Sequence, residues 1–313
     1  MPLGTAPGKG LQDRRTGEKR TGKEMVSNRS IRLTSGRLIR FPAIMGILNV
    51  TPDSFHAHSR FLDPDLAAGH AIEMESQGAA IIDVGGESMR PGAEGVVPAK
   101  EELARVIPVI REIRRRSPVL ISIDTRKAEV AAAAIAAGAS IVNDVSAMEF
   151  DPTMAEVAAK TRCGVILMHM RGTPVTMDSL ARYHDVTRDV GAYLKARARI
   201  AVEAGILPRR IVLDPGLGFA KTGRHNLELI AGLARICALG FPVAVGPSRK
   251  RFVRTICGDE DAAAVRGTAA VAAIAVANGA MIVRVHEPAA VKAAVAIATA
   301  VRYGAVQYYG WPR

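Results

Sequence analysis

The chain repeats one unit eight times: a short apolar run, a turn rich in Gly, Asp, Asn or Pro, and then a stretch with helical spacing. Each run is almost continuously apolar and rich in β-branched residues. Such runs are typical of parallel strands that are covered on both faces. We therefore expect eight parallel strands, over residues 43–50, 79–85, 119–125, 140–146, 164–170, 211–216, 242–247 and 281–286.

The segments between these runs carry apolar residues at every third or fourth position, which predicts amphipathic helices. The clearest lie over residues 98–116, 127–137, 179–204 and 261–278. Eight strand-then-helix units in roughly 270 residues agree with a (β/α)₈ barrel. A doubly wound open sheet is the alternative, but no G-x-G-x-x-G follows the first run. The predicted fold class is therefore α/β, a single-domain (β/α)₈ TIM barrel over residues 37–313.

The first 36 residues are predicted to form a flexible basic tail. Ten Lys and Arg against three Asp and Glu fall within the first 40 residues, so this part supplies +7 of the net charge of +12. A solvated tail is the simpler interpretation, and a nucleic-acid-binding arm is the alternative. One Trp and few other aromatic residues leave little to stack against bases. We expect no nucleic-acid partner.

The composition is that of a globular protein with a large core, because hydrophobic residues make up 49% of the chain. The longest apolar runs are alanine-rich and much shorter than the roughly 20 residues that a membrane span needs. The first residues contain no apolar h-region of the kind found in signal peptides, so we predict a cytoplasmic protein without a membrane partner. Three cysteines lie far apart, so neither a zinc site nor a disulfide framework is expected.

Each predicted strand ends in polar side chains or is followed by them. In a (β/α)₈ barrel the active site lies at the carboxyl ends of the strands, so these side chains are expected to converge there. A barrel in which they served only as helix caps would need few of them. The set comprises Asn49, Asp53, Glu87, Arg90, Asp124, Asn143, Asp144, His169, Arg171, Asp214, Ser248, Arg249, Lys250, Arg284 and His286.

Three members of this set have the chemistry to bind a flat nitrogen heterocycle. Asp124, Asn143 and Asp214 come from three different strand ends. Two carboxylates and an amide accept and donate hydrogen bonds in a fixed pattern, as such a ring requires. The carboxylate pair would also stabilise positive charge that develops on a bound ring.

Cations from the last two strands indicate an anionic ligand. Arg249, Lys250, Arg284 and His286 lie where phosphate sites often form in barrels, so a phosphate or pyrophosphate is expected. Asn49 offers an oxygen to a Mg²⁺ ion that bridges this pyrophosphate. Mg²⁺ is usually held by few protein oxygens together with phosphate and water.

Some of these residues also have purely structural interpretations. Asp53 fits a turn, Asp124 a helix cap and Asp144 a local structural role. His169 lies in an apolar run and fits a buried core histidine as well as a ligand. Both interpretations stay open on the sequence alone.

Eight motifs occur in order along residues 43–290: "GILNVTPDSF", "DVGGESMRPGA", "SIDT", "VNDVSA", "LMHMRGTP", "DPGLGFAKT", "VGPSRKRFV" and "RVHE". A single motif such as "DPG" is weak, but the ordered series resembles the dihydropteroate synthase family, which belongs to the wider pterin-binding barrels. The resemblance implies condensation of (7,8-dihydropterin-6-yl)methyl diphosphate with 4-aminobenzoate, giving 7,8-dihydropteroate and pyrophosphate. It also implies Mg²⁺ as the cofactor and a target of sulfonamides. Sensitivity to sulfonamides stays open on the sequence, because their site coincides with segments that depart from the family pattern.

The resemblance further implies roles for individual residues. The pterin ring would be held by Asp124, Asp214 and Lys250, which are the expected catalytic residues, and by Asn143. The diphosphate would be bound by Arg284 and His286, and its Mg²⁺ by Asn49. The aminobenzoate pocket would be formed by Phe55, Arg90, Pro91, Phe219, Lys221 and Ser248.

A homodimer through the last helices is also implied, with the small residues of 263–280 available for close helix packing. The other partners would be the two small-molecule substrates.

Two features depart from the family pattern, both on the aminobenzoate side. Met89 stands where the family usually has threonine, and "HAHSRF" (56–61) replaces a Ser-Asp-Gly-Gly-like stretch. Glycine allows loop closure at low steric cost, so its loss is expected to affect closure. A divergent pterin-binding paralogue with weak or no synthase activity is therefore one alternative. A methyltetrahydrofolate-dependent corrinoid methyltransferase is the other.

Overall fold

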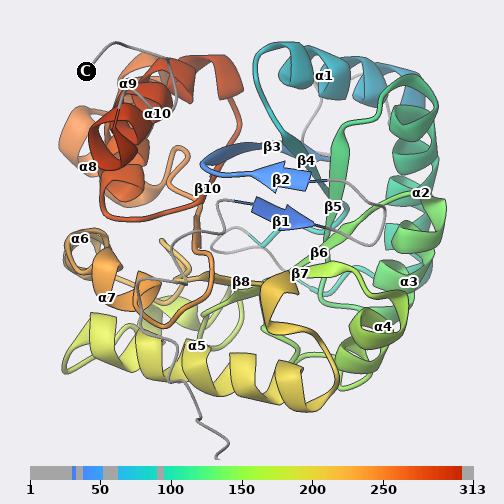
Figure 1. Cartoon of the computed structure of the whole chain (residues 1–313), viewed down its shortest axis with the longest axis horizontal. Helices are drawn as coiled ribbons and strands as arrows, with labels where there is room; N and C mark the ends of the chain where they lie inside the picture. Colours follow the sequence, from blue (N-terminus) through green and yellow to red (C-terminus); the bar gives the residue numbers. More distant parts are fainter. Residues whose placement is uncertain (1–29, 33–37, 52–62, 90–94, 305–313) are drawn as a thin grey trace, which may run out of the picture.

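Eight parallel strands form a nearly closed barrel in the computed structural model of the chain, which describes residues 30–32, 38–51, 63–89 and 95–304 (Figure 1). Neighbouring strands pair in the order β8-β7-β6-β5-β4-β3-β10-β9, and a parallel bridge from Leu213 to Val243 joins the two ends. The predicted (β/α)₈ barrel is thereby confirmed. The strands are β3 (Ala43–Asn49), β4 (Ile81–Gly85), β5 (Leu120–Asp124), β6 (Ile141–Asp144), β7 (Gly164–Met168), β8 (Ile211–Asp214), β9 (Ala244–Val245) and β10 (Ile282–Val285).

Helices surround the strands as an outer ring (Figure 1). Within the described ranges, no helix is long and apolar enough to cross a membrane. A cytoplasmic location stays a prediction. The helices are α1 (Pro64–Ser76), α2 (Ala99–Arg116), α3 (Ala128–Ala137), α4 (Met154–Thr161), α5 (Val186–Glu203), α6 (Gly223–Ala231), α7 (Leu233–Cys237), α8 (Arg251–Cys257), α9 (Asp261–Ala277) and α10 (Pro288–Tyr303), with short 3₁₀ helices η2 (Met177–Leu180) and η3 (Pro208–Arg210).

The helix predicted to begin at residue 179 begins later in the structure. Residues Met177–Leu180 form the separate turn η2, and α5 starts at Val186. The side chain of Asp185 accepts a hydrogen bond from the backbone N–H of Arg188 at 2.9 Å. This is an N-cap, which satisfies one of the unpaired N–H groups at the start of a helix. A local cap therefore sets the boundary that apolar spacing alone placed too early.

Side chains alternate between the barrel interior and the helix-covered face, and this alternation separates two cores. In β4, Ile81 packs inside the barrel, whereas Ile82 packs in the layer that the helices share. Every barrel strand contributes to the interior cluster, which consists of Ile39, Phe41, Ala43, Met45, Ile81, Leu120, Ile141, Ile166, Val212, Ala244 and Ile282.

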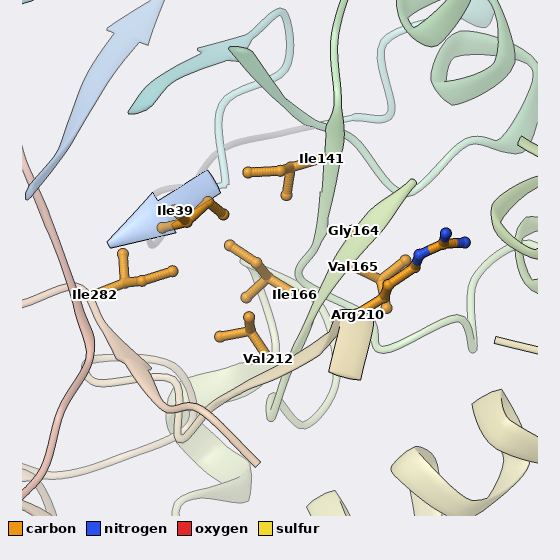
Figure 2. Close-up of a pocket in the computed structure, with 8 residues that line it drawn as sticks. All are labelled: Ile39, Ile141, Gly164, Val165, Ile166, Arg210, Val212 and Ile282. Carbon is orange, nitrogen blue, oxygen red and sulfur yellow. The ribbon is translucent and has the colours of Figure 1, made fainter. Parts of the chain in front are cut away.

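A short antiparallel hairpin covers the amino end of the barrel. Strand β1 (Ser30–Arg32) pairs with β2 (Leu38–Arg40), and the pair lies across the barrel opening in Figure 1. Ile39 is 2% exposed, and it points toward the ends of four interior side chains. Figure 2 shows Ile39 facing Ile141, Ile166, Val212 and Ile282 around a small apolar cavity. The hairpin therefore covers this end of the barrel interior with an apolar side chain.

The hairpin was not predicted from the sequence. Ser30–Arg32 form a strand although they fall within the predicted tail of residues 1–36. The other tail residues, 1–29 and 33–36, lie outside the described residues.

Candidate active site

A large open pocket lies at the carboxyl ends of the strands. It brings together most of the site residues predicted from the sequence. Phe55, Arg90 and Pro91 lie outside the described residues, as do Asp53 and the "HAHSRF" segment. The predicted residues that line the pocket are Asn49, Glu87, Asp124, Asn143, Asp214, Phe219, Lys221, Ser248, Arg249, Lys250, Arg284 and His286.

Strand alternation places these polar groups above the apolar interior. Asn143 follows the interior residue Ile141 by two positions, and Arg284 follows Ile282 in the same way. Because every second side chain of a strand points to the same face, these two polar groups stand one layer above an apolar one. Asp124 stands above Ser122, which in turn stands above the interior residue Leu120. The apolar residues of the barrel interior therefore lie beneath the polar side chains of the site.

Asp83, on β4, is a site residue that sequence reasoning missed. Its side chain is fully buried. Its Oδ2 accepts hydrogen bonds from Arg284 Nε at 2.6 Å and from Asn143 Nδ2 at 3.0 Å. Its Oδ1 has no hydrogen-bond partner among the residues that the structure describes. The sequence did contain a signal for Asp83. It follows the interior residue Ile81 by two positions, just as Asn143 follows Ile141.

Arg284 is held between two carboxylates. Besides its bond to Asp83, its Nη2 donates to Asp124 Oδ2 at 2.6 Å. Burial by itself lowers the pKa of Arg284, but the carboxylates of Asp83 and Asp124 outweigh burial and raise that pKa above its usual range. The guanidinium is therefore a charged donor in a fixed orientation.

The two predicted catalytic carboxylates titrate near neutral pH. Burial raises the pKa of Asp124 to about 7, although Arg284 acts in the opposite direction. Burial also raises the pKa of Asp214 to about 6, opposed by the backbone N–H of Gly216, which lies 2.7 Å from Oδ1. Burial therefore makes both carboxyl groups easier to protonate than an exposed aspartate.

The structure distinguishes between the functional and the purely structural interpretations of three residues. Asp124 pairs with Arg284, and the residue at the N-cap of α3 is Lys127, which forms no side-chain cap. Asp144 has the local structural role expected as its alternative, because it accepts hydrogen bonds from the backbone N–H groups of Ser146 and Met148. His169 is buried in the core, with 1% exposure.

Two glycines shape the turn after β8. Gly216 has φ +69°, and a Cβ there would lie 2.0 Å from the carbonyl oxygen of His169. Gly218 has φ +80°, and a Cβ there would lie 2.9 Å from Lys250 Cδ. Only glycine fits both the backbone conformation and the space. Lys250 therefore lies directly on this turn, with Nζ 4.2 Å from the centre of the Phe219 ring, a cation–π contact.

Lys221 supports the same turn from the protein interior, since it is only 2% exposed. Its Nζ lies 2.8 Å from the carbonyl oxygen of Phe219, 3.4 Å from that of His169 and 3.0 Å from His169 Nδ1. Burial lowers the pKa of Lys221 well below its usual range, and burial lowers the pKa of His169 to about 2. This geometry favours a supporting role, and direct contact of Lys221 with aminobenzoate stays a prediction.

An apolar wall borders the polar groups of the pocket. Met89 and Phe219 pack against the cluster of Val145, Met168 and Met170. Thioether side chains pack well against aromatic rings. Met89, which stands where the family usually has threonine, thus lies at the pocket. It forms part of a surface that suits a flat aryl group.

Four buried charges hold the segments that leave β4 and β5. Glu87 accepts hydrogen bonds from Arg126 Nη2 at 2.8 Å and from Lys127 Nζ at 2.6 Å. Lys127 also bonds to Glu102, and no side chain of the four is more than 9% exposed. Two positive and two negative charges balance, which such burial requires. This network fixes Glu87 two residues before Met89.

Comparison with known proteins points to one family over most of the barrel. A family model described as "Pterin binding enzyme" matches residues 45–286. The dihydropteroate synthase of Synechocystis sp. is 47% identical over 245 residues, which make up 78% of this chain and 84% of that protein.

Two solved structures of Xanthomonas albilineans dihydropteroate synthase are also similar. The structure with 4-aminobenzoic acid has a TM-score of 0.80 and 40% identity, covering 88% of this chain and 98% of that chain. The structure with 7,8-dihydropteroate has a TM-score of 0.78 and 38% identity, covering 88% and 99%.

The ion pairs of Arg284 predict the effect of removing Asp83. Asp83→Ala leaves part of a buried guanidinium uncompensated, so we expect the free energy of unfolding to fall by about 3 kcal/mol or more. Asp65→Ala is the matched control, because Asp65 is 69% exposed where it pairs with Arg116. The free energy of unfolding of this variant should fall by less than about 1 kcal/mol. Urea unfolding measures the free energy of unfolding of both variants. Equal decreases would contradict the prediction that the buried Asp83 pair stabilises the fold more than the exposed pair.

Proposed function

The chain belongs to the pterin binding enzyme family, and we propose that it acts as a dihydropteroate synthase. It condenses (7,8-dihydropterin-6-yl)methyl diphosphate with 4-aminobenzoate and releases pyrophosphate. The named activity of the relatives and the presence of 4-aminobenzoic acid and 7,8-dihydropteroate in the similar structures support this reaction.

One observation carries the proposal: three kinds of surface meet in one pocket. Carboxylates and an amide stand on β5, β6 and β8, where Asp124, Asn143 and Asp214 suit the N–H groups and ring nitrogens of a pterin. Cationic donors follow β9 and β10: Lys250 suits the ring-binding side, and Arg284 and His286 suit a diphosphate. The apolar wall suits the aryl ring of the second substrate.

The geometry supports a dissociative displacement. The bond between the pterin methylene carbon and the diphosphate oxygen breaks, and the leaving oxygen takes the electron pair. The carboxylates of Asp124 and Asp214 stabilise the cation that develops on the pterin. The amine of 4-aminobenzoate then forms the new carbon–nitrogen bond and loses a proton. None of these steps requires a nucleophilic side chain.

A role for Mg²⁺ forms part of the proposal. In the described part of the chain, no three His, Cys, Asp or Glu side chains gather as metal ligands. The donors present instead suit an ion held mostly by the substrate: Asn49 lines the pocket and offers one oxygen. Asn49 would hold Mg²⁺ together with diphosphate oxygens and water, and the ion would neutralise charge on the leaving group.

The alternatives give a poorer account of the pocket. A corrinoid-dependent methyltransferase has no use for cationic donors at the ends of β9 and β10. A divergent paralogue is favoured only by Met89 and by residues 56–61. Met89 belongs to a continuous apolar wall with Phe219, which agrees with an intact aryl site.

The direct test is a two-substrate assay with the purified full-length protein. We expect pyrophosphate release only when both the pterin diphosphate and 4-aminobenzoate are present. Chelation should abolish release and added Mg²⁺ should restore it. Asn49→Ala should need more Mg²⁺ for half-maximal rate, while its affinity for dihydropterin without diphosphate stays unchanged. Folded protein that shows no release would contradict the function, and release that survives chelation would contradict the Mg²⁺ role.

We also propose that the chain forms a homodimer through α8, α9 and α10. Gly267 does not contribute to the expected contact face of small residues, because it packs within the chain against Val253 and Cys257. Ala270 and Ala277 of α9 are exposed, so a contact through small residues stays a prediction. Large aliphatic side chains are also exposed on these helices. They are Ile256 (62% exposed), Ile274 (50%), Ile297 (67%) and Val301 (77%). Exposed apolar groups in such number favour burial against a partner, and the family resemblance points to a second copy.

The dimer proposal predicts the behaviour of a charged variant. The double variant Ile297→Lys and Val301→Lys should elute as a folded monomer, because burying two ammonium groups at the interface is costly. Leu66→Lys is the control, since Leu66 is 70% exposed on α1, outside these helices. Its dimer should persist. Light scattering after size exclusion measures the mass, and a monomeric wild type at micromolar concentration would refute the dimer.

A further inference from the structure

Ser248 and His286 form a two-point contact between neighbouring strand ends. Ser248 follows β9 and His286 follows β10. Ser248 Oγ lies 2.8 Å from His286 Nδ1, and the backbone N–H of His286 donates to the same Oγ at 3.2 Å. Ser248 is 8% exposed, and both residues line the pocket. One hydroxyl therefore holds both the backbone and the imidazole ring of His286.

The turn that carries Ser248 is itself fixed. The backbone N–H of Arg249 donates to Thr268 Oγ1 at 3.1 Å, and the hydroxyl of Thr268 donates to the carbonyl of Ala264 within α9. Lys250 N–H also donates to the carbonyl oxygen of Pro247 at 3.3 Å. The hydroxyl of Ser248 therefore has a defined position before any ligand binds, as a group that orients another side chain requires.

The contact also favours one form of the imidazole. Ser248 Oγ accepts the backbone N–H with one lone pair and keeps its own hydrogen, which donates to Nδ1 when Nδ1 carries no proton. Neutral His286 then carries its proton on Nε2, and protonated His286 carries protons on both nitrogens. In both cases Nε2 is a hydrogen-bond donor. Arg284, two residues earlier on the same strand, is the neighbouring cationic donor of the pocket.

We propose that Ser248 is a positioning residue that keeps His286 as an N–H donor to the leaving diphosphate. This inference rests on the proposed function, and it differs from the role in the aminobenzoate pocket that the family resemblance implies for Ser248. The two roles affect different substrates. Loss of the hydroxyl should weaken diphosphate binding if Ser248 acts through His286, and aminobenzoate binding if it contacts that substrate.

The test compares Ser248→Ala with wild type in the full chain. Calorimetry with inorganic pyrophosphate and Mg²⁺ should show about tenfold weaker binding, the effect of one lost hydrogen bond. The affinity for dihydropterin without diphosphate and the KM for 4-aminobenzoate should not change. Ser248→Thr keeps the hydroxyl and should recover most of the pyrophosphate affinity.

A double-mutant cycle supplies the second readout. His286→Ala should weaken pyrophosphate binding, and adding Ser248→Ala to it should have no further effect, because Ser248 acts only through the ring. The inference is overturned if Ser248→Ala raises the KM for 4-aminobenzoate at unchanged pyrophosphate affinity, or if the two substitutions add independently. If Ser248→Ala does not fold, Ser248→Cys in the same cycle decides between these results. Pyrophosphate binding is measurable without turnover, so failure of the proposed function would be seen separately in the two-substrate assay.

Discussion

A guanidinium held between two carboxylates, of which Asp83 is fully buried, is the constraint on which the polar end of the barrel depends. Arg284 bonds to Asp83 and Asp124 at 2.6 Å each. A buried charge without a partner costs several kcal/mol, so each of these residues needs the others to stay ionised in the interior. The three come from β10, β4 and β5, and Asp83 also orients Asn143 on β6. The ion pairs therefore fix the relative positions of four strand ends.

In the proposed reaction, the pocket separates the tasks of its substrates in space. The side with Asp124 and Asp214 would stabilise a cation, while the ends of β9 and β10 would supply donors for a leaving anion. The glycine turn after β8 lets Lys250 lie against Phe219, and buried Lys221 holds that turn from the interior. In the proposed reaction, the second substrate would lie against the apolar wall in which Met89 takes part. The proposed mechanism then needs binding groups and no nucleophilic side chain.

Much of this arrangement could be predicted from the sequence, because it rests on local periodicity. The apolar runs located all eight strands, and polar residues at their ends located the pocket. Asp83 was not predicted, because it lies inside its apolar run and not at the end, and only its alternation with Ile81 marks it as inward-facing. The start of α5 depends on one polar cap, and the β1–β2 hairpin consists of two three-residue strands, so neither leaves much periodic signal. The bond from Ser248 to His286 joins residues 38 positions apart, and only the closed barrel brings them together.

The central claim is that buried carboxylates at the strand ends recognise the pterin ring. Asp214→Asn tests it most directly, because asparagine keeps an oxygen for the Gly216 N–H and loses only the charge and one acceptor. Calorimetric titration with dihydropterin should show an affinity at least tenfold lower than that of the wild type, while the thermal midpoint is not reduced. An unchanged affinity in the folded variant would contradict the account, because the ring would then be held by groups other than these carboxylates.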